Sequence, residues 1–167
     1  MSALTSTAGT TTVRPAGSRL RVNLATVFTV LVALGIGYVG VSYLFAPEHT
    51  ASGFGMPVWP RGEAADFLTV KGFRDVVSGL VPLALLLTGH RRALGWALLA
   101  ESVTPFGDGT TILVHHGSTA TALGVHYATA VFVVVTAVLL LTERTGRTER
   151  TGRTERSGRT GRSSTEG

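Results

Sequence analysis

Five ionisable side chains lie in stretches of the sequence that are otherwise mostly apolar, and these side chains are the ones best placed to do chemistry. They are Arg74, Asp75, Glu101, Asp108 and His126. An ionisable side chain inside a membrane is costly unless it is paired or faces a polar interior. Such residues are therefore candidates for a ligand site, a proton pocket or an ion pair that holds helices together.

The uncharged segment from Val76 to Gly89 determines where Arg74 and Asp75 lie. A helix of these residues would be about 21 Å long, whereas the apolar core of a bilayer is about 30 Å thick. A helix that crosses the bilayer must therefore begin near Thr69, which makes it about 31 Å long. This start places both charged residues inside the membrane, so that neighbouring helices must solvate them.

The composition agrees with a membrane protein. The chain has 167 residues, a mean hydropathy of +0.32 and 15% charged residues, although both of its ends are polar. Its apolar residues are therefore concentrated in the middle. We predict an all-α fold, a four-helix transmembrane bundle within residues 22–142. Its helices are expected at about 22–46, 69–89, 93–114 and 119–141.

The distribution of charge predicts the orientation of this bundle. Arginines precede the first span, occur as the pair Arg91-Arg92 and recur after the last span, whereas the loop 47–68 carries more acid than base. Basic residues accumulate on the cytoplasmic side of membrane proteins. We therefore expect both termini in the cytoplasm and a multi-pass protein of the cell membrane.

The third segment is polar along one face. Glu101, Pro105 and Asp108 recur at steps of three and four residues, which is the spacing of one helix face. The rest of the segment is apolar, so the helix can lie in lipid if the polar face meets its partners. Pro105 lacks an amide hydrogen and is expected to kink the helix.

The predicted spans bring several polar residues to one depth. Counted at 1.5 Å per residue from the outer boundary, Arg74 lies about 7 Å deep, Asp108 about 9 Å and His126 about 10 Å. We expect Arg74, Asp75, Asp108 and His126 to converge in the outer half of the bundle, with Glu101 nearer the midplane and Tyr38 contributing from the first helix. The cluster is either a structural ion pair or a pocket for a ligand or a proton. A metal site is disfavoured because no ligand spacing recurs, and we expect neither a metal nor a cofactor.

The two ends of the chain are predicted to be disordered. Residues 1–21 form a polar basic leader, and residues 143–167 repeat a Thr-Glu-Arg-Thr-Gly-Arg hexapeptide without an apolar residue. The simpler interpretation of the tail is a charged extension that keeps the C-terminus in the cytoplasm. The more specific one is that its arginines contact anionic lipid. We do not expect nucleic acid as a partner, because the tail has no aromatic residue to stack on bases.

Four motifs carry a resemblance to a known family. They are Gly53-Phe54-Gly55-x-Pro57, Gly72-x-Arg74-Asp75-x-x-x-Gly79-Leu80, Pro105-x-x-Asp108 and His126. From about Leu44 to Leu141 the chain resembles the small membrane proteins grouped as domain of unknown function 4267, and more loosely the DoxX-type four-helix group. The resemblance implies a four-helix membrane protein of unassigned activity. No redox motif of the DoxX-type group is matched, so its chemistry is not carried over.

Three functions remain open at this point. The first is a binding or structural membrane module, which could form homo-oligomers through the small residues Ala120, Gly124 and Ala128. The second is a redox accessory or enzyme that acts on a lipophilic substrate such as a quinone beside Arg74 and His126. The third is a small proton-coupled carrier. No arrangement of a nucleophile with its base occurs, so no catalytic residue is assigned and an enzyme is disfavoured.

Overall fold

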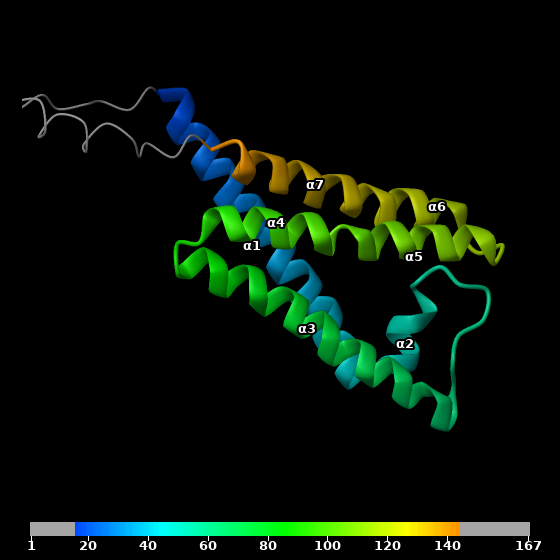
Figure 1. The fold of residues 1–167 in the computed structure, drawn as a ribbon. Coiled ribbons are helices and arrows are strands. Elements are labelled where there is room, and N and C mark those ends of the chain that lie inside the picture. The colour runs from blue at the N-terminus through cyan, green and yellow to red at the C-terminus, as the bar shows by residue number, and fades with distance from the viewer. Residues whose placement is uncertain (1–15, 144–167) are drawn as a thin grey trace, which may run out of the picture.

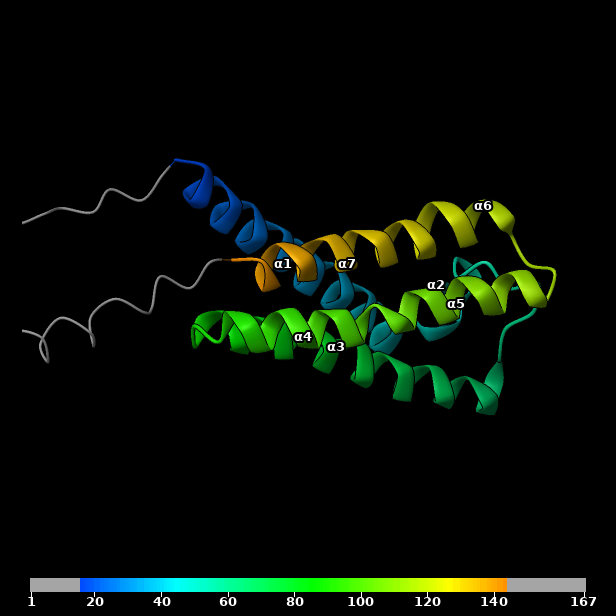
Figure 2. The same cartoon turned by 45° about the horizontal axis from the view of Figure 1, so that its top comes forward.

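The computed structural model describes residues 16–143, and among these residues every regular element is a helix. The predictions for residues 1–15 and for the tail from residue 144 onward lie outside the described residues. Figures 1 and 2 show the arrangement of the helices. In chain order the elements are α1 (Ala16–Phe45), α2 (Pro47–Ser52), η1 (Gly62–Ala65), α3 (Asp66–Leu87), α4 (Arg91–Glu101), α5 (Val103–Val114), α6 (Thr119–Thr121), the π-helix η2 (Ala122–Tyr127) and α7 (Ala128–Leu141).

The described residues differ from the prediction near both ends of the first span. The segment 16–21, assigned above to a disordered leader, belongs to α1. Its Arg21 donates a hydrogen bond from Nη1 to the carbonyl oxygen of Thr142 over 3.2 Å, which ties this turn to the end of α7. The segment 47–68, expected as a loop, contains α2, η1 and the first turn of α3. Pro47 is the first residue of α2, a position at which proline needs no hydrogen-bond acceptor.

The elements lie between two distinct ends of the molecule. The start of α1, the turn from α3 to α4 and the end of α7 meet at one end, whereas α2, the loop that follows it and the α5–α6 turn meet at the other (Figures 1 and 2). Arg91, the first residue of α4, connects the elements at the first of these ends. It donates two hydrogen bonds to the Glu143 carboxylate, of 2.6 and 2.7 Å, one to Thr26 and one to the carbonyl oxygen of Val22. The bonds to Glu143 raise the pKa of Arg91, so this guanidinium stays charged.

Glycines allow α1 and α3 to cross in direct backbone contact (Figure 1). A Cβ atom on Gly40 would lie 2.6 Å from the amide nitrogen of Val76, and one on Gly79 would lie 2.7 Å from the carbonyl oxygen of Ala33. A Cβ on Gly72 would likewise lie 2.9 Å from the carbonyl oxygen of Gly40. Small residues allow such close approach in membrane helices, where packing rather than a hydrophobic driving force joins the partners.

The hydrophobic core lies mainly between α4 and α7. Leu94 and Leu98 of α4 are fully buried and pack against a face of α7. The core is completed by Val133, Ala137 and Leu140 of that face and by Ala25 of α1.

Two helices are interrupted where the sequence carries a proline or a histidine. α4 ends at Glu101 and α5 begins at Val103, two residues before Pro105. Since Pro105 has no amide hydrogen, it cannot bond to the carbonyl oxygen of Glu101, which accounts for the break. The second interruption is the π-helix, which contains His126. Single π-turns within longer helices frequently occur at functional sites.

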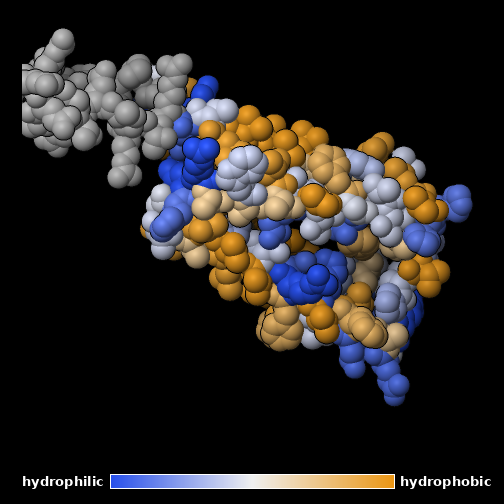
Figure 3. Space-filling model, viewed as in Figure 1, coloured by the Kyte–Doolittle hydropathy of each residue, from blue (hydrophilic) through white to orange (hydrophobic). Residues whose placement is uncertain are grey.

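Two helical stretches, Arg19–Phe45 and Thr119–Leu141, are long and apolar enough to cross a membrane. Large hydrophobic side chains also lie exposed on the other long helices, such as Leu80 at 58% on α3 and Val103 at 68% on α5. Figure 3 shows hydrophobic residues over much of one side of the molecule, with a hydrophilic patch in the hollow between α3 and α5.

The glycine contact between α1 and α3 is open to a matched test. Gly40→Ala should destabilise the protein by about 1–3 kcal/mol, because the added carbon meets the backbone of α3. Gly35→Ala adds the same carbon to the same helix where nothing lies within 4 Å, so it should be neutral or slightly stabilising. Thermal unfolding of the purified variants in detergent measures the difference, and equal melting temperatures would contradict the contact.

Candidate functional site

His126 is the centre of the polar residues in the half of the molecule that contains α2. Its side chain is 11% exposed, and its Nε2 lies 3.1 Å from the carbonyl oxygen of Phe54. A carbonyl oxygen can only accept a hydrogen bond, so Nε2 must carry the hydrogen. This bond joins the π-helix to the loop after α2, across 72 positions of sequence.

The other ring nitrogen of His126 faces a carboxylate. Nδ1 lies 3.7 Å from Oδ2 of Asp108 on α5. If the ring were neutral with its hydrogen on Nε2, the Nδ1 lone pair would face the lone pairs of an ionised carboxylate. The arrangement is favourable when one further proton is present, either on Nδ1 or on Asp108. The distance is longer than an ordinary hydrogen bond, so the two groups face each other without one.

A second ion pair lies on α3. Nζ of Lys71 is 2.5 Å from Oδ2 of Asp75, one helical turn away, and the Asp75 side chain is 9% exposed. The ammonium group also lies 4.9 Å from the ring centre of Tyr43 and 5.7 Å from that of Phe54. Aromatic rings attract cations over such distances, and the attraction is strongest where water is excluded.

Phe54 connects the two pairs. Its ring packs edge-on against the His126 imidazole, with 4.7 Å between the centres, and its other neighbour is Lys71. The buried Tyr43 faces the same ammonium group of Lys71. We define the polar cluster as Tyr43, Lys71, Asp75, Asp108 and His126. With one proton shared between Asp108 and His126, its formal charges sum to zero.

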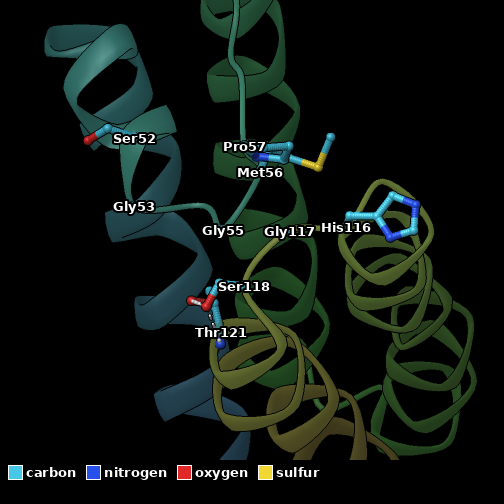
Figure 4. A pocket seen from close by; sticks show the side chains of 9 residues that line it. All are labelled: Ser52, Gly53, Gly55, Met56, Pro57, His116, Gly117, Ser118 and Thr121. Carbon is cyan, nitrogen blue, oxygen red and sulfur yellow. Dashed lines mark hydrogen bonds between the residues drawn. The ribbon is translucent and has the colours of Figure 1, made fainter.

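The loop that carries Phe54 is held against the α5–α6 turn. Gly55 has a φ of +102°, a conformation that favours glycine, and its carbonyl oxygen accepts a hydrogen bond from the amide of Ser118 over 2.8 Å. Gly117 approaches the same carbonyl so closely that it leaves no room for a Cβ. Figure 4 shows Ser118 bonded to Thr121 beside this contact. A pocket of about 390 Å³ opens here, lined by Ser52, Gly53, Gly55, Met56, Pro57, His116, Gly117, Ser118 and Thr121.

The structure places Asp75, Asp108 and His126 in the polar cluster, but it does not place Arg74 there. Arg74 is exposed. Together with Phe73, Val77 and Ser78 it lines a hollow of about 350 Å³. The face of α3 that packs inward is set by Gly72, Asp75, Gly79 and Pro82. Because consecutive helix positions point in different directions, the inward cation is the one a full turn before Asp75, Lys71.

Tyr38 and Glu101 also lie outside the polar cluster. Tyr38 is 74% exposed on α1, and Tyr43 of the same helix is the tyrosine that faces Lys71. Glu101 is partly buried at the end of α4, and no ion pair within residues 16–143 includes it. Sequence reasoning missed three contributors, Tyr43, Lys71 and Phe54. The spacing of Lys71 and Asp75, four positions apart, was a signal that could have found one of them.

A metal ion has no evident site in the part of the chain that the structure describes. No group of three or more histidine, aspartate or glutamate side chains is arranged there to hold one. The cluster instead combines a cation, two carboxyl groups, an imidazole and a phenol, which are groups that bind and exchange protons.

The left-handed Gly55 provides a test of the loop. Gly55→Ala should cost about 1–3 kcal/mol locally, because alanine would be strained at this φ and the new carbon lies 2.9 Å from Cβ of Thr121. Gly53→Ala is the control, since its φ is −87° and its nearest contact is an ordinary 3.6 Å. Hydrogen exchange of the Ser118 amide should accelerate in the first variant only. Equal exchange in both variants would contradict the role of Gly55.

One comparison with known proteins gives a match. The family described as a domain of unknown function (DUF4267) matches residues 33–140, which include every residue of the polar cluster. No curated protein and no solved structure matches the chain, so the looser likeness to the DoxX-type group is not shown.

Proposed function

This chain belongs to the DUF4267 family, and we propose that it is a multi-pass membrane protein whose polar cluster binds and releases a proton. The proposal has two parts. The first is that α1, α3, the α4–α5 pair and the α6–α7 stretch each cross the bilayer. The second is that Asp108 and His126 hold an exchangeable proton inside it.

The exposed surface supports the four crossings. Phe73 and Leu80 of α3 and Trp96 and Val103 of the α4–α5 pair are each more than half exposed, which suits contact with lipid better than contact with water. Long helices with apolar exteriors and a polar interior are typical of membrane bundles. We assign the end with Arg91 to the cytoplasm, because basic residues gather there, and the end with Glu63 to the outside.

The contacts of the cluster favour a functional role over a purely structural one. Lys71 and Asp75 lie on the same helix, so their ion pair joins no two helices. The helices are already joined by the glycine contacts of α1 with α3 and by the bonds of Arg91 at the other end. Buried charged groups add little stability compared with apolar residues of the same size. Their presence is better explained by what they bind.

A single observation carries the assignment of a proton as the ligand. Nε2 of His126 is committed to the carbonyl oxygen of Phe54, and Nδ1 faces the Asp108 carboxyl group. One proton satisfies this pair, and its removal leaves two acceptors facing each other. Phe54 packs against both His126 and Lys71, so the ion pair of Lys71 with Asp75 lies next to the Asp108–His126 pair. A quinone-type redox function is less favoured, because the hollow at Arg74 is lined by α3 residues alone.

Infrared difference spectroscopy of the full chain in lipid vesicles tests the proton site. On going from acid to alkaline buffer, the wild type should lose one proton from the Asp108–His126 pair. The difference spectrum should show this loss as a carboxyl or imidazolium band. Asp108→Asn should lose this band, because the amide can donate to Nδ1 and leave the ring neutral.

A histidine variant distinguishes this band from other histidines. His115→Gln, on the exposed α5–α6 turn, should retain the band of the pair. If Asp108→Asn titrates like the wild type, the pair holds no exchangeable proton and the proposed function fails.

A further inference from the structure

Arg74 of α3 has no counter-charge among residues 16–143, unlike two other cations of the helices. Lys71 pairs with Asp75, and Arg91 pairs with Glu143. Within residues 16–143 no carboxylate pairs with Arg74, although its helix is proposed to cross the bilayer. An uncompensated guanidinium at that depth is costly. A partner of negative charge is therefore expected from outside the described residues.

The surroundings of Arg74 indicate an amphiphilic partner. The hollow of about 350 Å³ has a polar side, formed by Arg74 and the hydroxyl of Ser78, and an apolar side formed by Phe73 and Val77. Phe73 is 61% exposed and Val77 is 55% exposed, and the apolar surface continues one turn further at Leu80. A molecule with an anionic head and a hydrocarbon chain would satisfy both sides.

The position of Arg74 along α3 selects the leaflet. It lies eight positions after Asp66, the first residue of the helix, or about 12 Å along the axis. A long arginine side chain can extend toward the membrane surface over such a distance while its stem stays in the apolar region. Its planar guanidinium can bind two phosphate oxygens at once. A free inorganic anion would leave Phe73, Val77 and Leu80 uncovered.

We propose that Arg74, Ser78, Phe73 and Val77 form a binding site for one anionic phospholipid of the leaflet next to α2. The phosphate binds the guanidinium and the Ser78 hydroxyl, and one acyl chain covers Phe73, Val77 and Leu80. This site rests on the proposed crossing of the bilayer by α3, but it is separate from the Asp108–His126 pair. The lipid neutralises Arg74 as Asp75 neutralises Lys71.

Native mass spectrometry of the full chain in detergent tests the site, with phosphatidylglycerol and phosphatidylcholine as the two probes. The wild type should retain one phosphatidylglycerol in preference to phosphatidylcholine. Arg74→Gln should bind it about tenfold more weakly, the scale expected for lost hydrogen bonds to a charged group. Arg92→Gln is the matched control, because Arg92 is an exposed arginine at the other end of the molecule, and it should bind like the wild type.

A second variant tests the site without removing the arginine. Val77→Glu places a carboxylate one turn from Arg74 and supplies the missing counter-charge. It should abolish retention of phosphatidylglycerol while the positive charge remains, even if Arg74→Gln fails to fold.

Four results would overturn the lipid site. They are equal retention of both lipids, equal retention by wild type and Arg74→Gln, an equal loss in Arg92→Gln, and displacement of the lipid by inorganic phosphate at equal concentration. Asp108→Asn should still bind the lipid, so failure of the lipid site and failure of the proton site are distinguishable.

Discussion

The central constraint on this fold is that α3 carries Lys71, Arg74 and Asp75 within one turn of a helix that we propose crosses the membrane. Each charge needs a partner, and the partners differ. Asp75 is neutralised by Lys71 on its own helix, and the aromatic rings of Tyr43 and Phe54 surround that ammonium. Arg74 points to another side of the helix, where we propose a lipid phosphate. The rest of the bundle can be understood as the set of elements that keeps these charges in place.

Two kinds of contact set the position of α3. Gly40, Gly72 and Gly79 allow it to cross α1 backbone to backbone, which turns Asp75 inward. The loop after α2 then covers the cluster, because Gly55 bonds to the α5–α6 turn and Phe54 bonds to His126. A change in the proton held by Asp108 and His126 would therefore act on the bond that fastens the loop. His126 therefore takes part both in the proposed proton site and in the hydrogen bond that holds the loop after α2.

Much of this arrangement could be predicted from the sequence, and the exceptions have physical reasons. Asp108 and His126 were expected at one depth because the lengths of the apolar segments limit where each residue can lie. Lys71 was missed in favour of Arg74 because hydropathy does not reveal which way a helix is rotated, and only its spacing of four positions from Asp75 indicated the pair. Tyr43 was missed in favour of Tyr38 for the same reason. The π-helix around His126 adds a residue to one turn without a recognisable local signal.

The most direct test of the account is whether α3 crosses the membrane. The chain contains no cysteine, so single cysteines can be introduced at the exposed positions Ala64, His90 and His115 and labelled with a maleimide that does not cross membranes. The account predicts that Ala64→Cys and His115→Cys are labelled on intact cells and that His90→Cys is labelled only after the membrane is permeabilised. Labelling of all three on intact cells would show that neither α3 nor the α4–α5 pair crosses, and would contradict the account.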